Sequence, residues 1–292
     1  TAVKRLMKEK WGYLFLLPWL VFLLVFTIYP FFYGFGASLY DYTLTRQVFT
    51  GLENYRQIFR DEAFARSISA TLCYAAILLP LTVCLSLWIA NVITKFRERT
   101  SGVFKAIFYL PTITSQVALV VVWNFIFAPS FGLLANLFQM AGLTPVSWFD
   151  DPAKAIPLLA ILILSYTMGQ PIILYSAGIG NIPASYFEAA RIDGATDRQL
   201  FFKITLPMLR SVTTYILITC TIGMLQIFAV PYLMTGGGPN NTTSTLLMMV
   251  YKSAFINGNF GYASAVGVML FLITAVIAAL QFRVMRADAL EF

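Results

Sequence analysis

The sequence predicts an all-α polytopic membrane protein, and two features of its composition support this. Of the 292 residues, 59% are hydrophobic and 11% are charged, whereas soluble domains carry about 25% charged residues. The hydrophobic residues also occur in runs long enough to cross a bilayer, which takes about 20 residues. We expect one transmembrane domain over residues 1–292. Its six predicted spans are roughly 12–38, 68–93, 103–127, 155–180, 212–234 and 262–283.

The Lys and Arg residues set the predicted orientation of these spans. Most of the 20 fall on the side of the N-terminus, for example Lys4, Arg5, Lys8 and Lys10, while the acidic residues divide almost evenly. Because cytoplasmic loops carry an excess of Lys and Arg, both termini are expected in the cytoplasm. The net charge of +7 is then an orientation signal and not a sign of nucleic-acid binding.

The chain lacks the ionisable groups that an intramembrane enzyme or an ion-driven carrier would need. It has no His, and Cys73, Cys84 and Cys220 lie in hydrophobic runs without a CxxC spacing. Charged residues occur only outside or at the ends of the spans, whereas proton relays place them at bilayer depth. We therefore expect no catalytic residue, no metal site and no cofactor bound by this chain, and an external source of energy.

Three outer segments carry local signals. Residues 39–67 mix aromatic and charged residues, which predicts a short amphipathic interfacial helix. Asp150-Asp151 could serve acid–base chemistry or bind a cation, but Pro152 follows, so a helix N-cap is the simpler interpretation. Residues 243–255 are apolar but too short to span, which predicts a re-entrant or interfacial helix.

The Gly-rich run at 236–238 precedes that apolar segment. Triple Gly could suggest a phosphate cradle, but no strand precedes it and no Lys-Ser/Thr follows it. Pro239, Asn240 and Asn241 come next, and this composition is typical of a turn.

Spans four and five carry polar residues and helix breakers near mid-depth. The Gly-Gln-Pro triplet at 169–171 should break span four, because Pro removes a helical hydrogen bond, and Tyr166 lies close by. In span five Thr219, Gly223 and Gln226 share one helical face. These residues could serve packing between helices. They could also line a path for a neutral, hydroxyl-rich solute.

A charged segment, residues 182–210, joins spans four and five on the cytoplasmic side. A capping box at 185–188 predicts a helix that ends at Gly194, and a second capping box at 196–199 predicts another helix. From the pattern alone, this helix–turn–helix could pack on its own bundle or dock on a partner.

The residues E-A-A-R-I-D-G-A at 188–195 and I-T-L-P at 204–207 resemble the EAA loop of the membrane subunits of binding-protein-dependent ABC importers. The resemblance extends over essentially the whole chain. Y-L-P at 109–111, G-L-L-A-N at 132–136 and T-G-G-G-P at 235–239 are similar to the carbohydrate-uptake branch, and more narrowly to the maltose-permease F-type and glycerol-phosphate-permease A-type subunits. Unlike the maltose subunit, this chain is expected to have the shorter six-span form.

The resemblance implies two functional sites. In the family, the EAA loop inserts a coupling helix into a groove of the ATPase subunit. The implied coupling residues here are Glu188, Ala189, Ala190, Arg191, Asp193, Gly194 and Ala195. A mid-membrane sugar site is implied at Met168, Gly169, Gln170, Ile172, Thr219, Gly223 and Gln226, to which the polar pattern of span four adds Tyr166. Gln226 and Ile227 replace the family's Asn-rich run, so the resemblance does not identify the sugar.

The implied partners are a second, similar permease subunit, two cytoplasmic ATPase subunits that bind ATP and Mg, an extracytoplasmic solute-binding protein and membrane lipid. The implied location is the bacterial inner membrane. The expected function is one half of the translocation pathway of an ATP-driven sugar importer that works by alternating access. The alternative is a self-sufficient secondary carrier or channel for a small neutral solute.

Overall fold

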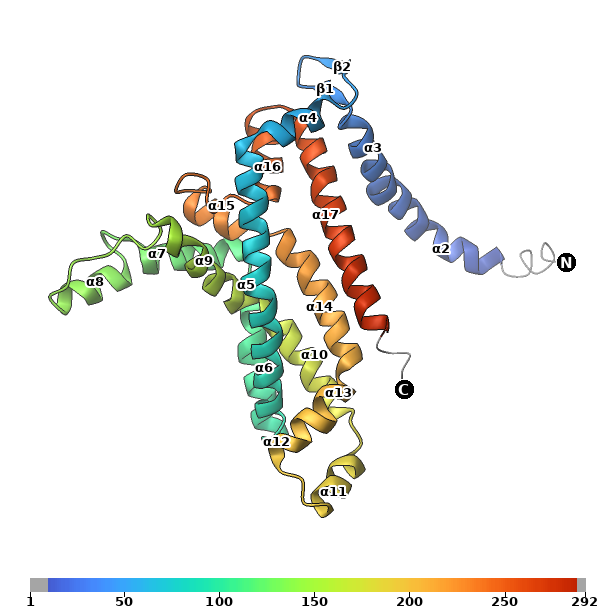
Figure 1. Cartoon of the computed structure of the whole chain (residues 1–292), viewed down its shortest axis with the longest axis vertical. Helices are drawn as coiled ribbons and strands as arrows, with labels where there is room; N and C mark the ends of the chain where they lie inside the picture. The colour runs from blue at the N-terminus through green and yellow to red at the C-terminus, as the bar shows by residue number, and fades with distance from the viewer. Residues whose placement is uncertain (1–9, 288–292) are drawn as a thin grey trace. The chain divides into compact units, whose positions relative to one another are not determined.

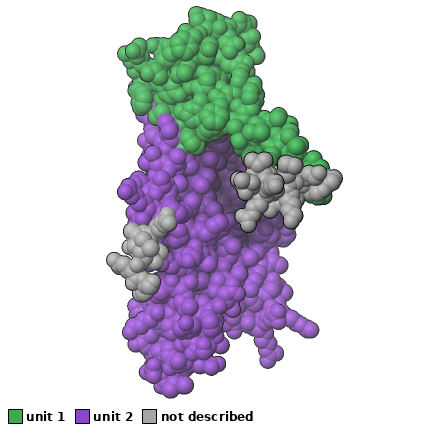
Figure 2. All heavy atoms as spheres, turned by 90° about the vertical axis from the view of Figure 1, so that its right-hand side faces the viewer, with its two compact units in different colours: residues 1–61, 249–271 green, residues 62–248, 272–292 purple. Residues whose placement is uncertain are grey.

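The structure, a computed structural model, describes residues 10–287. The basic residues Lys4, Arg5 and Lys8, on which the predicted orientation partly rests, lie outside this range. Two compact units are present and are coloured separately in Figure 2. The first takes in the described residues up to Asp61 together with Met249–Phe271, and the second takes in Glu62–Met248 and the described residues from Leu272 onward.

The first unit begins with one long, apolar helical run (Figure 1). Its elements are α2 (Lys10–Leu23), η1 (Leu24–Ile28), α3 (Tyr29–Ala37), β1 (Tyr40–Tyr42), β2 (Gln47–Phe49), α4 (Glu53–Arg60), η3 (Lys252–Ile256) and the first part of α17 (Phe260–Ala287).

The short helix predicted within residues 39–67 is present as α4 (Glu53–Arg60), and a small antiparallel hairpin that was not predicted precedes it. β1 and β2 pair Tyr40 with Phe49 and Tyr42 with Gln47. The aromatic and β-branched residues of this stretch favour strands, and Asn54 fixes the hairpin by donating to the carbonyl oxygens of Ser38 at 2.8 Å and Tyr40 at 2.9 Å.

The second unit is built of helices. Its elements are α5 (Glu62–Ile93), α6 (Glu98–Ile113), α7 (Gln116–Phe127), α8 (Leu133–Met140), α9 (Pro152–Thr167), α10 (Gly169–Gly180), α11 (Ala184–Ile192), α12 (Asp197–Leu200), η2 (Phe201–Thr205), α13 (Leu206–Met208), α14 (Arg210–Leu225), α15 (Ala229–Thr235), the first part of α16 (Leu246–Tyr251) and the rest of α17. Of these, α6, α9, α10 and α14 contact the longest helix of the unit, α5.

The predicted spans correspond to helices of the structure. Among the described residues, 4 helices are long and apolar enough to cross a membrane: Leu14–Ala37, Glu62–Ile93, Arg210–Thr235 and Phe260–Met285. Up to 6 spans result if each of two bent pairs, α6–α7 and α9–α10, counts as one. The all-helical membrane fold is therefore confirmed. The predicted short outer helix is also present, at Leu246–Ile256.

Two of the spans bend sharply, and only one of these bends was predicted. The axes of α9 and α10 differ by 49°, at the Gly-Gln-Pro triplet of 169–171. The axes of α6 and α7 differ by 94°, because Thr114 and Ser115 between them have non-helical backbone angles, with ψ of 143° and 128°. The predicted span at 103–127 is thus made of two helices, and the break between them was not predicted.

Helix caps explain the ends of the helices around the predicted coupling segment. The capping box at 196–199 is confirmed: Thr196 accepts from the Gln199 amide N–H, and the Gln199 side chain accepts from the Thr196 amide N–H at 2.8 Å. The capping box at 185–188 was wrong, because Pro183 is the residue before the helix and Ser185 lies inside α11. Asp151 is an N-cap, as predicted, and accepts from the Ala153 N–H at 3.0 Å.

Two buried clusters hold the second unit together around α5. One includes Tyr74, Leu78, Leu159 and Ile163, and joins α5 to α9. The other includes Leu87 and Ala90 of α5 with Tyr175 of α10 and Ile216 of α14. The clusters leave α9, α10 and α14 fixed against the same helix, and the cavity described next lies among these helices.

Candidate translocation site

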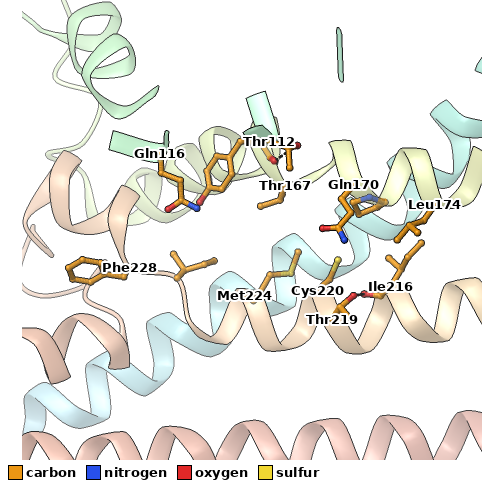
Figure 3. Close-up of a pocket in the computed structure, with 14 residues that line it drawn as sticks. Thr112, Gln116, Thr167, Gln170, Leu174, Ile216, Thr219, Cys220, Met224 and Phe228 are labelled. Atoms are coloured by element: carbon orange, nitrogen blue, oxygen red, sulfur yellow. Dashed lines mark hydrogen bonds between the residues drawn. The ribbon is translucent and has the colours of Figure 1, made fainter. Parts of the chain in front are cut away.

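A cavity of about 300 Å³ lies within the second unit where α6, α7, α9, α10 and α14 meet. It is shown in Figure 3. Its lining residues are Thr112, Gln116, Tyr166, Thr167, Gln170, Pro171, Leu174, Ile216, Thr219, Cys220, Gly223, Met224, Ile227 and Phe228. The cavity therefore collects side chains from three of the predicted spans.

The lining is polar but uncharged. Figure 3 shows the amide end of Gln170 pointing from α10 toward Met224 and Cys220 of α14, and Gln116 projecting from the α7 side. Hydroxyl groups come from threonines and Tyr166, and none of the described lining residues is charged. Amides and hydroxyls both donate and accept hydrogen bonds, and the apolar remainder can cover the faces of a ligand. This chemistry suits a neutral solute with many hydroxyl groups.

The structure brings four of the residues predicted to bind substrate to this cavity. They are Tyr166, Gln170, Thr219 and Gly223. The other four, Met168, Gly169, Ile172 and Gln226, lie outside its lining.

For three of these four residues, the local environment explains why they do not line the cavity. Ile172 is fully buried, and the side chain of Gln226 is exposed. Gly169 is buried where α6 comes close, since a Cβ there would collide with the Thr112 hydroxyl and the Phe108 carbonyl oxygen. Gly169 thus permits the close approach of two spans, and any contact of these residues with substrate stays a prediction.

Among the lining residues that were not predicted, three carry a hydroxyl or an amide: Thr112, Gln116 and Thr167. Thr112 donates to the Tyr166 carbonyl oxygen at 2.9 Å, close to the α9–α10 break, where backbone carbonyls lose their helical partners. Gln116 reaches the cavity because the chain turns at 114–115. The signal that could have identified the first two is the run of polar residues at 114–116, together with Thr112, inside an otherwise apolar span.

The predicted coupling segment has a different character, because little of it is packed. None of the residues of α11 is buried, and Ile192 is 86% exposed. Gly194 has φ +78°, a conformation that favours glycine, and ends the helix as predicted. Lys95 forms an ion pair with Asp197 of α12, with 3.4 Å between nitrogen and oxygen. Most of the predicted coupling residues are exposed, and Ala190 and Ala195 are half-buried.

No group of three or more His, Cys, Asp or Glu side chains that could hold a metal ion is found in the described part of the chain. The ion pairs of the second unit lie away from the cavity, at exposed positions such as Asp151 with Lys154. At that pair, the hydrogen bond from Lys154 and then the one from the Ala153 N–H lower the pKa of the Asp151 carboxyl.

Comparison with known protein families identifies the chain. Residues 99–287 match the family described as "Binding-protein-dependent transport system inner membrane component". The probable ABC transporter permease protein YurN of Bacillus subtilis is 34% identical over 286 residues, which cover 96% of this chain and 97% of YurN. The chain belongs to this family of permeases. It is thus a multi-pass inner-membrane permease of an ABC transporter, as its EAA-like loop predicted.

Other permeases of the family are similar over almost their whole length. The lactose transport system permease protein LacF of Rhizobium radiobacter is 32% identical, with 94% of each chain covered. The trehalose/maltose transport system permease protein MalF of Thermococcus litoralis is 30% identical, with 98% of this permease and 97% of MalF covered.

A solved structure shares the fold of the permease. The crystal structure of a bacterial alginate ABC transporter, in complex with its alginate pentasaccharide-bound periplasmic protein, contains a chain with a TM-score of 0.85 and 23% sequence identity. The similarity covers 98% of this permease and 97% of that chain.

Proposed function

We propose that this permease forms one half of the translocation pathway of an ATP-driven importer for a neutral sugar. The uncharged polar cavity is the observation that carries the proposal, because its amides and hydroxyls match the hydroxyl groups of a sugar. Similar permeases named for lactose and for trehalose and maltose transport support the choice of sugar as substrate class.

Within the cavity, Gln116, Gln170 and Thr219 would exchange hydrogen bonds with sugar hydroxyls. The rings of Tyr166 and Phe228 would cover the apolar face of the pyranose ring. Alginate, the acidic sugar of the structurally similar transporter, needs a cationic partner. No Lys or Arg occurs among the described lining residues here, so we assign a neutral substrate to this permease.

Energy would enter through the exposed segment at 182–210. In our proposal α11 docks into a groove of an ATPase subunit, and Glu188, Ala189, Ala190, Arg191, Asp193, Gly194 and Ala195 form or shape the docking surface. The exposed apolar side chains of Tyr186 and Ile192, 53% and 86% accessible, would be covered by that partner. ATP and Mg would bind to the ATPase subunits and not to this chain.

The full complex would hold a second, similar permease, two ATPase subunits and a solute-binding protein on the outer side. ATP-driven closure of the ATPase subunits would move the coupling helices, and the cavity would open alternately to the two sides of the membrane. The bends between α6 and α7 and between α9 and α10 would let half-spans tilt without breaking regular helical hydrogen bonds.

Reconstitution into liposomes tests this function. The complete complex with its binding protein is expected to take up a neutral oligosaccharide in an ATP-dependent manner, and a charged uronic-acid oligosaccharide is expected to fail. The permease alone should show neither ATPase activity nor gradient-driven uptake. Robust uptake by the permease alone would overturn the proposal in favour of a self-sufficient carrier or channel.

A further inference from the structure

The outer loop that follows α15, residues 236–245, is packed into the second unit. Thr243 and Thr245 are fully buried, and Ser244 is 5% exposed. Connecting loops usually run over the protein surface, because buried backbone groups need hydrogen-bond partners. A loop with this much buried polar surface must therefore be held by many specific hydrogen bonds.

Hydrogen bonds from two neighbouring elements hold the loop. The hydroxyls of Thr235, at the end of α15, and Thr243 are 2.7 Å apart. On the α5 side, Thr71 accepts from the Leu246 N–H at 2.9 Å, and Arg66 donates to the Asn240 carbonyl oxygen at 3.0 Å. The loop is thus fastened at its start, at its tip and at its end.

The end of this loop reaches the break in span five. Regular helix stops at Leu225 and resumes at Ala229. Pro231 accounts for the break, because it has no N–H to offer the carbonyl four residues earlier, that of Ile227, and its ring would collide with that carbonyl. The Thr245 hydroxyl donates to this freed carbonyl oxygen at 2.6 Å.

This hydrogen bond lies directly behind the wall of the cavity. Ile227, whose carbonyl is held, and its neighbour Phe228 both line the cavity. In the predicted topology they lie at its outer end, since α14 starts on the cytoplasmic side. The position of these two side chains therefore depends on the anchor that Thr245 gives to the backbone.

We propose that Thr245 is a positioning residue for the transported sugar. By holding the Ile227 carbonyl, it keeps Ile227 and Phe228 in place, so that the outer loop at 236–245 sets the shape of the outer end of the cavity. Displacement of this loop releases the carbonyl and changes that end of the cavity. The inference rests on the proposed function and adds to it the element that controls the cavity from outside.

Three variants separate this role from a general effect of packing. Thr245→Val keeps a side chain of similar shape and removes the hydroxyl, which donates to Ile227 and also accepts from the Met248 N–H at 3.3 Å. Thr245→Ser keeps this hydroxyl. Thr82→Val is the matched control, because Thr82 of α5 is also fully buried but its hydroxyl has no partner among the described residues. All three are assembled into the complete complex.

The first readout is sugar uptake in proteoliposomes, per assembled complex. Thr245→Val is expected to raise the apparent KM about tenfold, a size that the loss of one hydrogen bond to a buried acceptor allows. The maximal rate should change little. Thr245→Ser and Thr82→Val should keep the KM of the unchanged complex.

The second readout is the reactivity of Cys220, whose side chain lines the same cavity. In a background with Cys73→Ser and Cys84→Ser, the rate of reaction with a small maleimide is expected to shift several-fold in Thr245→Val and to return in Thr245→Ser. This readout needs no sugar. If the unchanged complex fails to transport sugar, the proposed function fails, and the maleimide reaction still decides whether Thr245 positions the cavity wall.

The outcomes that would overturn the inference are specific. One is an unchanged KM together with an unchanged Cys220 reaction in Thr245→Val. Another is an equal defect in Thr245→Ser or Thr82→Val. If Thr245→Val does not assemble, Thr245→Cys replaces it for the uptake measurement, because a thiol is a much weaker donor. An unchanged KM in Thr245→Cys would likewise overturn the inference.

Discussion

The two loops on either side of span five are built on opposite principles. The cytoplasmic segment at 182–210 carries a helix, α11, with no buried residue, and its shape comes from local features such as the capping box at 196–199. In the outer loop at 236–245, the fully buried Thr243 and Thr245 bond to α15 and to the break of span five. Arg66 of α5 donates to the loop backbone at Asn240. In our account, the cytoplasmic segment binds another protein, and the outer loop packs against the helices of its own chain.

This difference indicates how a bundle without charged residues inside its spans can be driven. In our proposal, the ATPase subunits apply force to the exposed segment, and α10 and α14 would receive it because they flank this segment in the chain; both helices line the cavity. The packed outer loop would oppose the resulting movement at the outer end of span five. Variants of the two loops should therefore fail in different ways, coupling in the first case and substrate recognition in the second.

The largest effect is expected for Gly194→Val. A β-branched residue at φ +78° strains the backbone, by roughly 1–2 kcal/mol, and redirects the turn between α11 and α12. Sugar uptake and binding of the ATPase subunits should both fall by more than about tenfold, a loss of about 1.4 kcal/mol or more, while insertion into the membrane stays normal. Gly194→Asn is the control, because Asn tolerates this conformation. Normal sugar-stimulated ATPase activity in Gly194→Val would count against the coupling role.

Glu188→Lys should have the next largest effect. Glu188 is exposed on α11, so the reversed charge cannot harm a core and acts only on a docking partner. We expect weaker recruitment of the ATPase subunits, measured by co-purification, with unchanged expression. Arg198→Glu reverses a charge on α12, outside the predicted coupling residues, and should have a smaller effect. Equal effects of the two reversals would place the docking surface elsewhere.

Gln170→Leu should raise the KM for sugar and leave coupling intact. Gln170 lines the cavity, and losing its amide removes up to two hydrogen bonds to substrate, each worth about 1 kcal/mol. A rise of about tenfold is expected in uptake kinetics. Gln226→Leu is the matched comparison, since Gln226 was predicted for the same site but lies outside the lining of the cavity. A larger rise for Gln226→Leu would contradict our assignment of the cavity.

The smallest effect is expected for Asp151→Ala, at a residue that belongs to neither loop. Because the folded-state pKa of Asp151 is lowered by Lys154 and the Ala153 N–H, its stabilising effect is present at neutral pH and is lost as the pH falls through that lowered value. The thermal midpoint should drop slightly at neutral pH, and the gap should close in acid. Asp150→Ala is the control. If the difference in thermal midpoint between Asp151→Ala and the unchanged protein grows in acid, the N-cap role of Asp151 is contradicted.

The sequence predicted the features that local chemistry controls. The apolar runs predicted the spans, and the triplet at 169–171 predicted the break in span four. Thr196 and Gln199 predicted the second capping box. Pro183 overrode the expected cap at Ser185 because proline next to a helix start imposes its own geometry. The break and the two caps depend on residues within about one helical turn, and each span depends on one continuous apolar run.

The features that escaped prediction depend on contacts between distant residues. The 94° bend between α6 and α7 brings Gln116 to a cavity formed by other spans, and a polar run alone does not give its angle. The hairpin at 40–49 was not predicted, because the aromatic residues of this stretch fit an interfacial helix equally well and the pairing of the two strands is not visible in the local pattern. The bond from Thr245 to Ile227 joins residues 18 positions apart, and nothing in the local pattern at either residue indicates it.

Hydrogen–deuterium exchange of the assembled transporter tests the contrast between the two loops most directly. The account predicts that amides of 184–200 exchange quickly in the permease alone and become protected when the ATPase subunits bind. Amides of 242–246 should exchange slowly in both states, since buried and hydrogen-bonded amides open rarely. Unchanged fast exchange at 184–200 in the full complex, or protection that appears only at 242–246, would contradict the account.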